Sequence, residues 1–112
     1  MLARANRVVK PSDFRAIVRR GRRASTASML VYRVERDAAD PARFGFIVAK
    51  TVGNAVERNL VRRRLRAACR SVVDSGGRGA DVVIRALPAS AKTDWSALSR
   101  EVHEILDPVL IR

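Results

Sequence analysis

The chain has 112 residues, of which 47% are hydrophobic, and this is enough to build the core of one domain over residues 1–112. It carries 23 lysines and arginines against 11 acidic residues, a formal net charge of +12, and it has one cysteine. These numbers exclude an internal disulfide and a multi-cysteine zinc site, and they favour a polyanionic partner. No apolar run approaches the roughly 18 residues of a membrane span, and the N-terminus does not resemble a secretory signal. A cytoplasmic protein that does not enter the membrane is expected.

The basic residues are clustered rather than spread over the chain. Residues 1–23 contain eight basic side chains and one acidic one, and residues 50–70 contain seven basic side chains and one acidic one. Mixed charge over the whole surface would suffice for solubility. The two clusters therefore indicate two places where the chain meets an anionic partner.

The first half of the chain predicts a helix followed by two or three strands. The helix covers about residues 13–20, with Ser12 as its N-cap. Residues 28–36 alternate in the way of a half-buried strand, and residues 22–27 can supply a short additional one. Residues 43–49 are apolar on both faces, which predicts a central strand.

A long helix is predicted to follow, from about residue 55 to residue 73. Asn54 is placed to cap it, and Glu57 is placed to complete a capping box. A strand over residues 80–87 comes next. The last helix starts at Thr93 or Asp94.

Pro108 is expected to end the regular part of the last helix. The order of elements is then one helix, two or three strands, a helix, a strand and a helix. This pattern predicts an α+β domain in which helices cover a small sheet.

The polar side chains of the long helix gather on one side of it. On a wheel of about 100° per residue, six of them share an arc of roughly 140°, namely Arg58, Asn59, Arg62, Arg63, Arg66 and Arg70. Like charges four residues apart destabilise an isolated helix, and Glu57 is the one acidic residue nearby in the sequence. Guanidinium groups bind phosphates in a bidentate manner, so this face predicts a nucleic-acid contact.

Residues 48–66 resemble the signature segment of the bacterial ribonuclease P protein subunit. The matching pattern is a Gly-Asn-Ala turn, then Arg-Asn, two basic residues and a final arginine, here Gly53, Asn54, Ala55, Arg58, Asn59, Arg62, Arg63 and Arg66. Smaller matches occur at Asn6-Arg7, Asp13-Phe14, Gly21 and Tyr32. The resemblance covers essentially the whole chain.

This resemblance implies a fold and a function. The fold would be a small α/β sandwich of order α-β-β-β-α-β-α, like the second domain of ribosomal protein S5, with a left-handed βαβ crossover. The function would be that of a protein cofactor that assists an RNA enzyme in removing the 5′ leader of precursor tRNA. Catalysis would belong to the RNA, and the required Mg²⁺ would be bound mainly by the RNA.

The resemblance also implies two binding surfaces. The catalytic RNA would contact Lys50, Asn54, Arg58, Asn59, Arg62, Arg63, Arg66 and Arg70. The leader would lie in a cleft between the first helix and the sheet, at Phe14, Val18 and Tyr32. The family often has a second aromatic residue where Val18 stands, and Ser and Lys where Ala49 and Thr51 stand. These departures weaken the expected cleft more than the arginine-rich helix.

Other interpretations share part of this pattern. A general basic DNA-binding or ribosomal protein could use the same helix, but it gives no reason for the Gly-Asn-Ala and Arg-Asn motifs. A helix lying on a membrane surface would need the apolar face that the sheet requires. Cys69 is expected in the core, and His103, the single histidine, has no partner at metal-ligand spacing. No nucleophile–base pair is expected, so no catalytic or metal-binding residue is assigned to the polypeptide.

Overall fold

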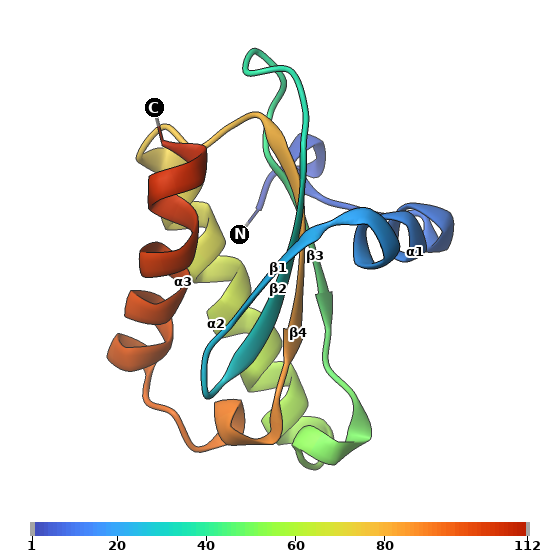
Figure 1. The fold of residues 1–112 in the computed structure, drawn as a ribbon. Coiled ribbons are helices and arrows are strands. Elements are labelled where there is room, and N and C mark those ends of the chain that lie inside the picture. The colour runs from blue at the N-terminus through green and yellow to red at the C-terminus, as the bar shows by residue number, and fades with distance from the viewer. Residues whose placement is uncertain (1, 112) are drawn as a thin grey trace.

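The computed structural model describes residues 2–111 as three helices around a four-stranded sheet (Figure 1). The strands are β1 (Arg22–Ser25), β2 (Met29–Glu35), β3 (Arg43–Ile47) and β4 (Ala80–Ala86). The helices are α1 (Pro11–Arg20), α2 (Ala55–Asp74) and α3 (Trp95–Leu110). Figure 1 shows α2 and α3 packed on one face of the sheet and α1 on the other. The predicted α+β class and order of elements are confirmed, including the short first strand.

The sheet is mixed, with the strand order β1-β2-β4-β3. β2 is antiparallel to both β1 and β4, whereas β3 and β4 are parallel neighbours. A parallel pair needs a crossover connection, and α2 provides it. The β3-α2-β4 unit is therefore the expected crossover, and its left-handed sense stays a prediction.

The prediction that residues 43–49 form a central strand is wrong. β3 lies at the edge of the sheet, and β4 is the strand buried between two neighbours. β3 is apolar on both sides because Phe44 and Phe46 pack with the core under α2, while Ile47 packs on the α1 side. Its outer edge is partly covered by the N-terminal segment, where the Val8 N–H donates to the Phe44 carbonyl at 2.9 Å. Apolar residues on both faces of a strand indicate that both faces are covered. They do not show that the strand lies in the middle of the sheet.

Alternation along β2 separates the two layers of the core. Met29 and Val31 belong to the main cluster beneath α2 and α3, whereas Tyr32 belongs to a smaller cluster beneath α1. The smaller cluster also contains Ile17 of α1, and Phe14 packs against it from the same helix. The arrangement fixes α1 on the sheet and leaves the opposite face to α2 and α3.

The ends of the helices agree with the sequence at the start of α2 and at the start of α3, and differ at two other ends. Asp94 caps α3, because its Oδ1 accepts from the Ala97 N–H at 2.8 Å. The capping box of α2 is present, because Asn54 Oδ1 accepts from the Glu57 N–H at 2.8 Å and Glu57 Oε1 accepts from the Asn54 N–H at 2.9 Å. Ser12 is not a cap: α1 begins one residue earlier, at Pro11, whose fixed φ suits the first helical position.

The expected stop at Pro108 is also wrong, since α3 continues to Leu110. A proline in the last turn removes one backbone hydrogen bond, and the full burial of Leu106 and Leu110 holds that turn against the sheet. No helix in the described part of the chain combines the length and the apolar character needed to cross a membrane.

Candidate nucleic-acid interface

The predicted arginine-rich surface of α2 forms in the structure. We use "arginine face" for Arg58, Asn59, Arg62, Arg63 and Arg66. Opposite this face, the α2 side chains that pack on the sheet and on α3 are fully or almost fully buried, namely Val61, Leu65, Ala68, Cys69 and Val72. Within residues 2–111 no arginine of the face makes an ion pair, and the one side-chain hydrogen bond there runs from Arg62 Nη1 to Asn59 Oδ1 at 3.1 Å. These cations therefore lack a paired counter-charge in the part of the chain that the structure describes.

Two other arginines of α2 are held by the protein itself. Arg70 Nε lies 3.0 Å from Asp74 Oδ1, so this predicted RNA contact already has an acidic partner one turn away. The expectation that Glu57 was the one nearby acid missed this pair, because Asp74 lies beyond the basic cluster in the sequence. Arg64 Nη1 donates to the Thr93 carbonyl at 3.2 Å and joins α2 to the segment before α3.

The remaining predicted contacts lie at the N-terminal end of α2. Lys50 is exposed in a short 3-10 turn, and Asn54 is exposed while its side-chain oxygen caps the helix. Arg58 is half-buried, and its Nε is buried without a hydrogen-bond partner in the described part of the chain. Lys50 and Asn54 therefore extend the arginine face from Arg58 toward the turn that follows β3.

A second surface, here called the α1 groove, runs between α1 and the sheet. It encloses about 360 Å³ and is lined by Phe14, Arg15, Val18, Arg19, Ile47 and Arg85. Phe14 and Val18 are among the predicted cleft residues, one turn apart on α1. The three arginines and Ile47 were not predicted for the cleft, although the N-terminal basic cluster signalled Arg15 and Arg19. An apolar floor with a cationic rim suits unpaired bases joined by phosphates.

Tyr32 does not line the α1 groove. Its side chain lies beneath α1 with Val8, Ile17 and Val83, and the residue is only 8% exposed. The ring is therefore largely covered, and packing is the main role that the structure gives it.

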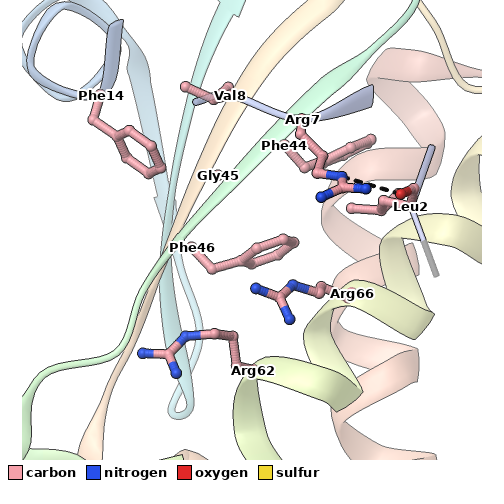
Figure 2. Close-up of a pocket in the computed structure, with 9 residues that line it drawn as sticks. All are labelled: Leu2, Arg7, Val8, Phe14, Phe44, Gly45, Phe46, Arg62 and Arg66. Atoms are coloured by element: carbon pink, nitrogen blue, oxygen red, sulfur yellow. Dashed lines mark hydrogen bonds between the residues drawn. The ribbon is translucent and has the colours of Figure 1, made fainter. Parts of the chain in front are cut away.

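A small cavity connects the two surfaces across the edge strand β3 (Figure 2). This junction cavity of about 130 Å³ is lined by Phe14 from the α1 side and by Arg62 and Arg66 from α2. In Figure 2 Arg66 reaches toward the Phe46 ring, Arg62 extends toward the strand, and Phe14 lies on the other side of β3. Gly45 makes the connection possible, since a Cβ there would lie 2.5 Å from the Phe14 ring. The arginine face and the α1 groove are thus adjacent.

One side-chain arrangement contradicts the expectation that no nucleophile–base pair forms. His103 Nε2 lies 3.1 Å from Ser71 Oγ, and His103 Nδ1 lies 2.9 Å from both carboxylate oxygens of Asp107. Ser71 lies inside α2, where the backbone N–H groups are already hydrogen-bonded along the helix and form no oxyanion site. We therefore interpret the trio as a link between α2 and α3.

The cysteine and the possible metal ligands were also considered in the sequence. Cys69 is fully buried, as predicted, and desolvation raises the pKa of its thiol. Among residues 2–111 no group of three or more His, Cys, Asp or Glu side chains is placed to hold a metal ion.

Comparison with known proteins gives a consistent result. The family model described as Ribonuclease P matches residues 2–109. The "Ribonuclease P protein component" of Clavibacter michiganensis subsp. michiganensis is 49% identical over 102 residues, covering 91% of this chain and 90% of that protein. The protein of the same name from Pseudarthrobacter chlorophenolicus is 44% identical over 112 residues, covering all of this chain and 82% of that protein.

Solved structures of this type share the fold. The RNase P protein of Staphylococcus aureus superposes with a TM-score of 0.84 at 24% identity, covering 97% of this chain and 100% of that one. The RNase P protein of Thermotoga maritima gives a TM-score of 0.80 at 20% identity, covering 92% of this chain and 96% of that one. The motif of α2, the sequence matches and the shared fold agree, and the chain belongs to the ribonuclease P protein family.

Proposed function

We propose that the chain binds two RNAs at adjacent surfaces, as the protein component of ribonuclease P. The arginine face docks on the catalytic RNA, and the α1 groove holds the single-stranded 5′ leader of precursor tRNA. The protein thereby increases the affinity of the holoenzyme for precursor tRNA and assists the removal of the leader.

The junction cavity at Gly45 is the observation that carries this proposal. Arg62 and Arg66 of the docking surface and Phe14 of the α1 groove line the same cavity of about 130 Å³. A leader lying in the groove would therefore run next to the docked catalytic RNA. This adjacency is what a cofactor needs if it is to present a leader to an RNA active site.

In this function the RNA, and not the polypeptide, carries out the cleavage. Four of the five side chains of the arginine face are cationic, and the amide oxygen of the fifth, Asn59, already accepts a hydrogen bond from Arg62 Nη1. Glu57 is engaged in the capping box, and Asp74 is engaged with Arg70. Mg²⁺ prefers phosphate and carboxylate oxygens, so these residues do not fit the ion and RNA phosphates would hold it.

The direct test compares precursor and mature tRNA in the reconstituted holoenzyme. The protein should stimulate cleavage by the cognate RNA at low Mg²⁺. Phe14→Ala should lower the affinity for precursor tRNA by about 1–3 kcal/mol and leave the affinity for mature tRNA unchanged, because stacking on the leader is lost. Thermal unfolding of the variant must be measured in parallel, since Phe14 packs against the α1 cluster. Equal losses for both tRNA forms in a folded variant would contradict leader binding in the groove.

Gly45→Ala provides an independent test of the junction. The added methyl group must displace the Phe14 ring, at a cost of about 1–3 kcal/mol in stability. Leader affinity should fall with it, while affinity for the catalytic RNA should stay, because the arginine face is untouched. A general DNA-binding or ribosomal role, the alternative, predicts no difference between precursor and mature tRNA in either variant.

A further inference from the structure

Five arginines around the end of α1 and the start of β1 are used neither by the arginine face nor by the core. These "α1–β1 arginines" are Arg15, Arg19, Arg20, Arg22 and Arg23, and all of them are exposed. Within residues 2–111 none of them makes an ion pair or a side-chain hydrogen bond. Arg15 and Arg19 line the α1 groove, so the series starts at that groove and leads away from it.

The backbone beneath these side chains is firmly placed. Gly21 ends α1 with its N–H donating to the Ile17 carbonyl at 2.8 Å, and a Cβ at Gly21 would lie 2.9 Å from the Arg33 nitrogen. The next residue begins β1, which pairs with β2 along its whole length. The arginines are therefore presented by fixed elements.

The sheet register places Arg22 and Arg23 on opposite faces of the free edge. Arg23 stands opposite Tyr32, whose side chain belongs to the α1 side, and Arg22 stands opposite Arg33, on the α3 side. Because β1 ends the sheet, both side chains flank an unpaired strand edge. The basic surface therefore continues from the α1 groove around the edge of the sheet.

Local stability does not account for this arrangement. Arg19 and Arg20 are favourable at the C-terminus of α1, and charge on an edge strand discourages aggregation. However, Arg22 lies directly across from Arg33, and like charges in that position destabilise an antiparallel pair. Glu35 lies 2.9 Å from Arg33 Nη1 and balances one of these two charges, so one positive charge of the pair remains in excess. An external polyanion would supply the missing counter-charge.

We propose that the α1–β1 arginines bind the part of a single-stranded leader that extends beyond the α1 groove. This inference rests on the proposed function and adds a substrate preference: precursor tRNAs with long leaders bind more tightly than those with short ones. The contacts are to phosphates, because Tyr32, the aromatic residue opposite Arg23, is buried beneath α1 and does not offer its ring for stacking. The preference is therefore independent of leader sequence and sensitive to salt.

The experiment measures equilibrium binding of precursor tRNAs to the holoenzyme at several salt concentrations. The tRNA body is kept constant, and the leaders have about five, ten and twenty nucleotides, which brackets usual single-strand site sizes. The wild-type protein should bind the longest leader about tenfold more tightly than the shortest. Its salt dependence should be steeper by about 0.7 log units for each added phosphate contact.

The triple variant Arg20→Gln, Arg22→Gln, Arg23→Gln should lose most of the gain from leader length. It should keep its affinity for the catalytic RNA and for the shortest leader. The matched control Arg78→Gln, Lys92→Gln, Arg100→Gln removes the same charge at exposed positions away from α1 and should retain the gain. Circular dichroism checks the fold, and each single Arg→Gln change should remove part of the gain if the triple variant unfolds.

Two results would overturn the inference. In one, the triple variant keeps the full dependence on leader length. In the other, it weakens binding of the catalytic RNA as much as binding of long leaders, which assigns the arginines to docking. If the wild-type holoenzyme bound precursor tRNA with the shortest leader no more tightly than mature tRNA, leader binding in the α1 groove would be refuted instead. The two failures are therefore distinguishable.

Discussion

Arginines do different work at the two ends of the β3-α2-β4 unit. Where β3 and β4 begin, Arg43 donates from Nε and Nη2 to the two oxygens of Asp81 at 2.8 and 2.7 Å, and Arg36 lies 3.3 Å from the same carboxylate. The hydrogen bond with Asp81 raises the pKa of Arg43. On α2, the arginine face has no acidic partner within residues 2–111. The difference separates arginines that complete the fold from arginines that await an external anion.

The largest effect is expected from removing the unpaired charges. Arg62→Gln, Arg63→Gln, Arg66→Gln should weaken binding of the catalytic RNA by at least about a hundredfold. The slope of log affinity against log salt should fall by about two to three units, since each lost phosphate contact accounts for about 0.7 to 0.9. The unfolding midpoint should barely change, because none of the three side chains is buried and none makes an ion pair within residues 2–111. Titration with fluorescent RNA at several salt concentrations measures both quantities, and unchanged RNA affinity would refute the docking role.

Breaking the paired group should act on stability instead. Asp81→Ala leaves Arg43 and Arg36 without their shared carboxylate, and the Asp81 side chain is only 11% exposed. The cost should be about 2 kcal/mol in the free energy of unfolding, below the figure for a fully buried pair because both arginines reach solvent. Chemical denaturation gives this number. Glu35→Ala is the control: Glu35 pairs with Arg33, but its own side chain is 65% exposed, so the change should cost well under 1 kcal/mol.

Arg70 stands between the two groups, since it lies in the basic helix but pairs with Asp74. Asp74→Asn should leave stability nearly unchanged, because a weak ion pair is lost together with an unfavourable negative charge at the end of α2. Without the neighbouring negative charge, Arg70 should strengthen binding of the catalytic RNA by about 0.5–1 kcal/mol. A combined Arg70→Gln, Asp74→Asn variant should remove the gain, and a gain that survives would point to the lost negative charge alone.

The smallest effect is expected from exchanging one cation for another. Arg63→Lys keeps the charge and loses the planar fork that binds phosphate in a bidentate manner. RNA affinity should fall less than in Arg63→Gln, by about 0.5 kcal/mol, with an unchanged salt slope. A loss equal to that of Arg63→Gln would show that geometry outweighs charge at this position.

Sequence reasoning succeeded where local pattern decides the structure. The capping box of Asn54 and Glu57 is a local pattern, and the arginine face follows from helical periodicity; both are present as predicted. The alternation of β2 correctly separated Met29 and Val31 from Tyr32.

Prediction failed where distant parts of the chain decide. β3 looked central because two faces are covered, yet its neighbour on one side is the N-terminal segment rather than a strand of the sheet. Tyr32 was expected to line the leader cleft and is covered by α1. The junction at Gly45 depends on a ring that lies 31 residues earlier in the sequence. The Ser71–His103 contact likewise needs two helices to meet.

Because Cys69 is completely buried, the rate at which its thiol is labelled can report how often the protein opens around it. Alkylating reagents attack the thiolate, and burial both shields the sulfur and raises the pKa of the thiol. Because the sequence has one cysteine, labelling of the native protein proceeds only when α2 separates from the layer beneath it. The labelling rate thus reports the free energy of that separation without any added probe. A docked RNA that holds α2 in place should slow the reaction in proportion to the stability it adds.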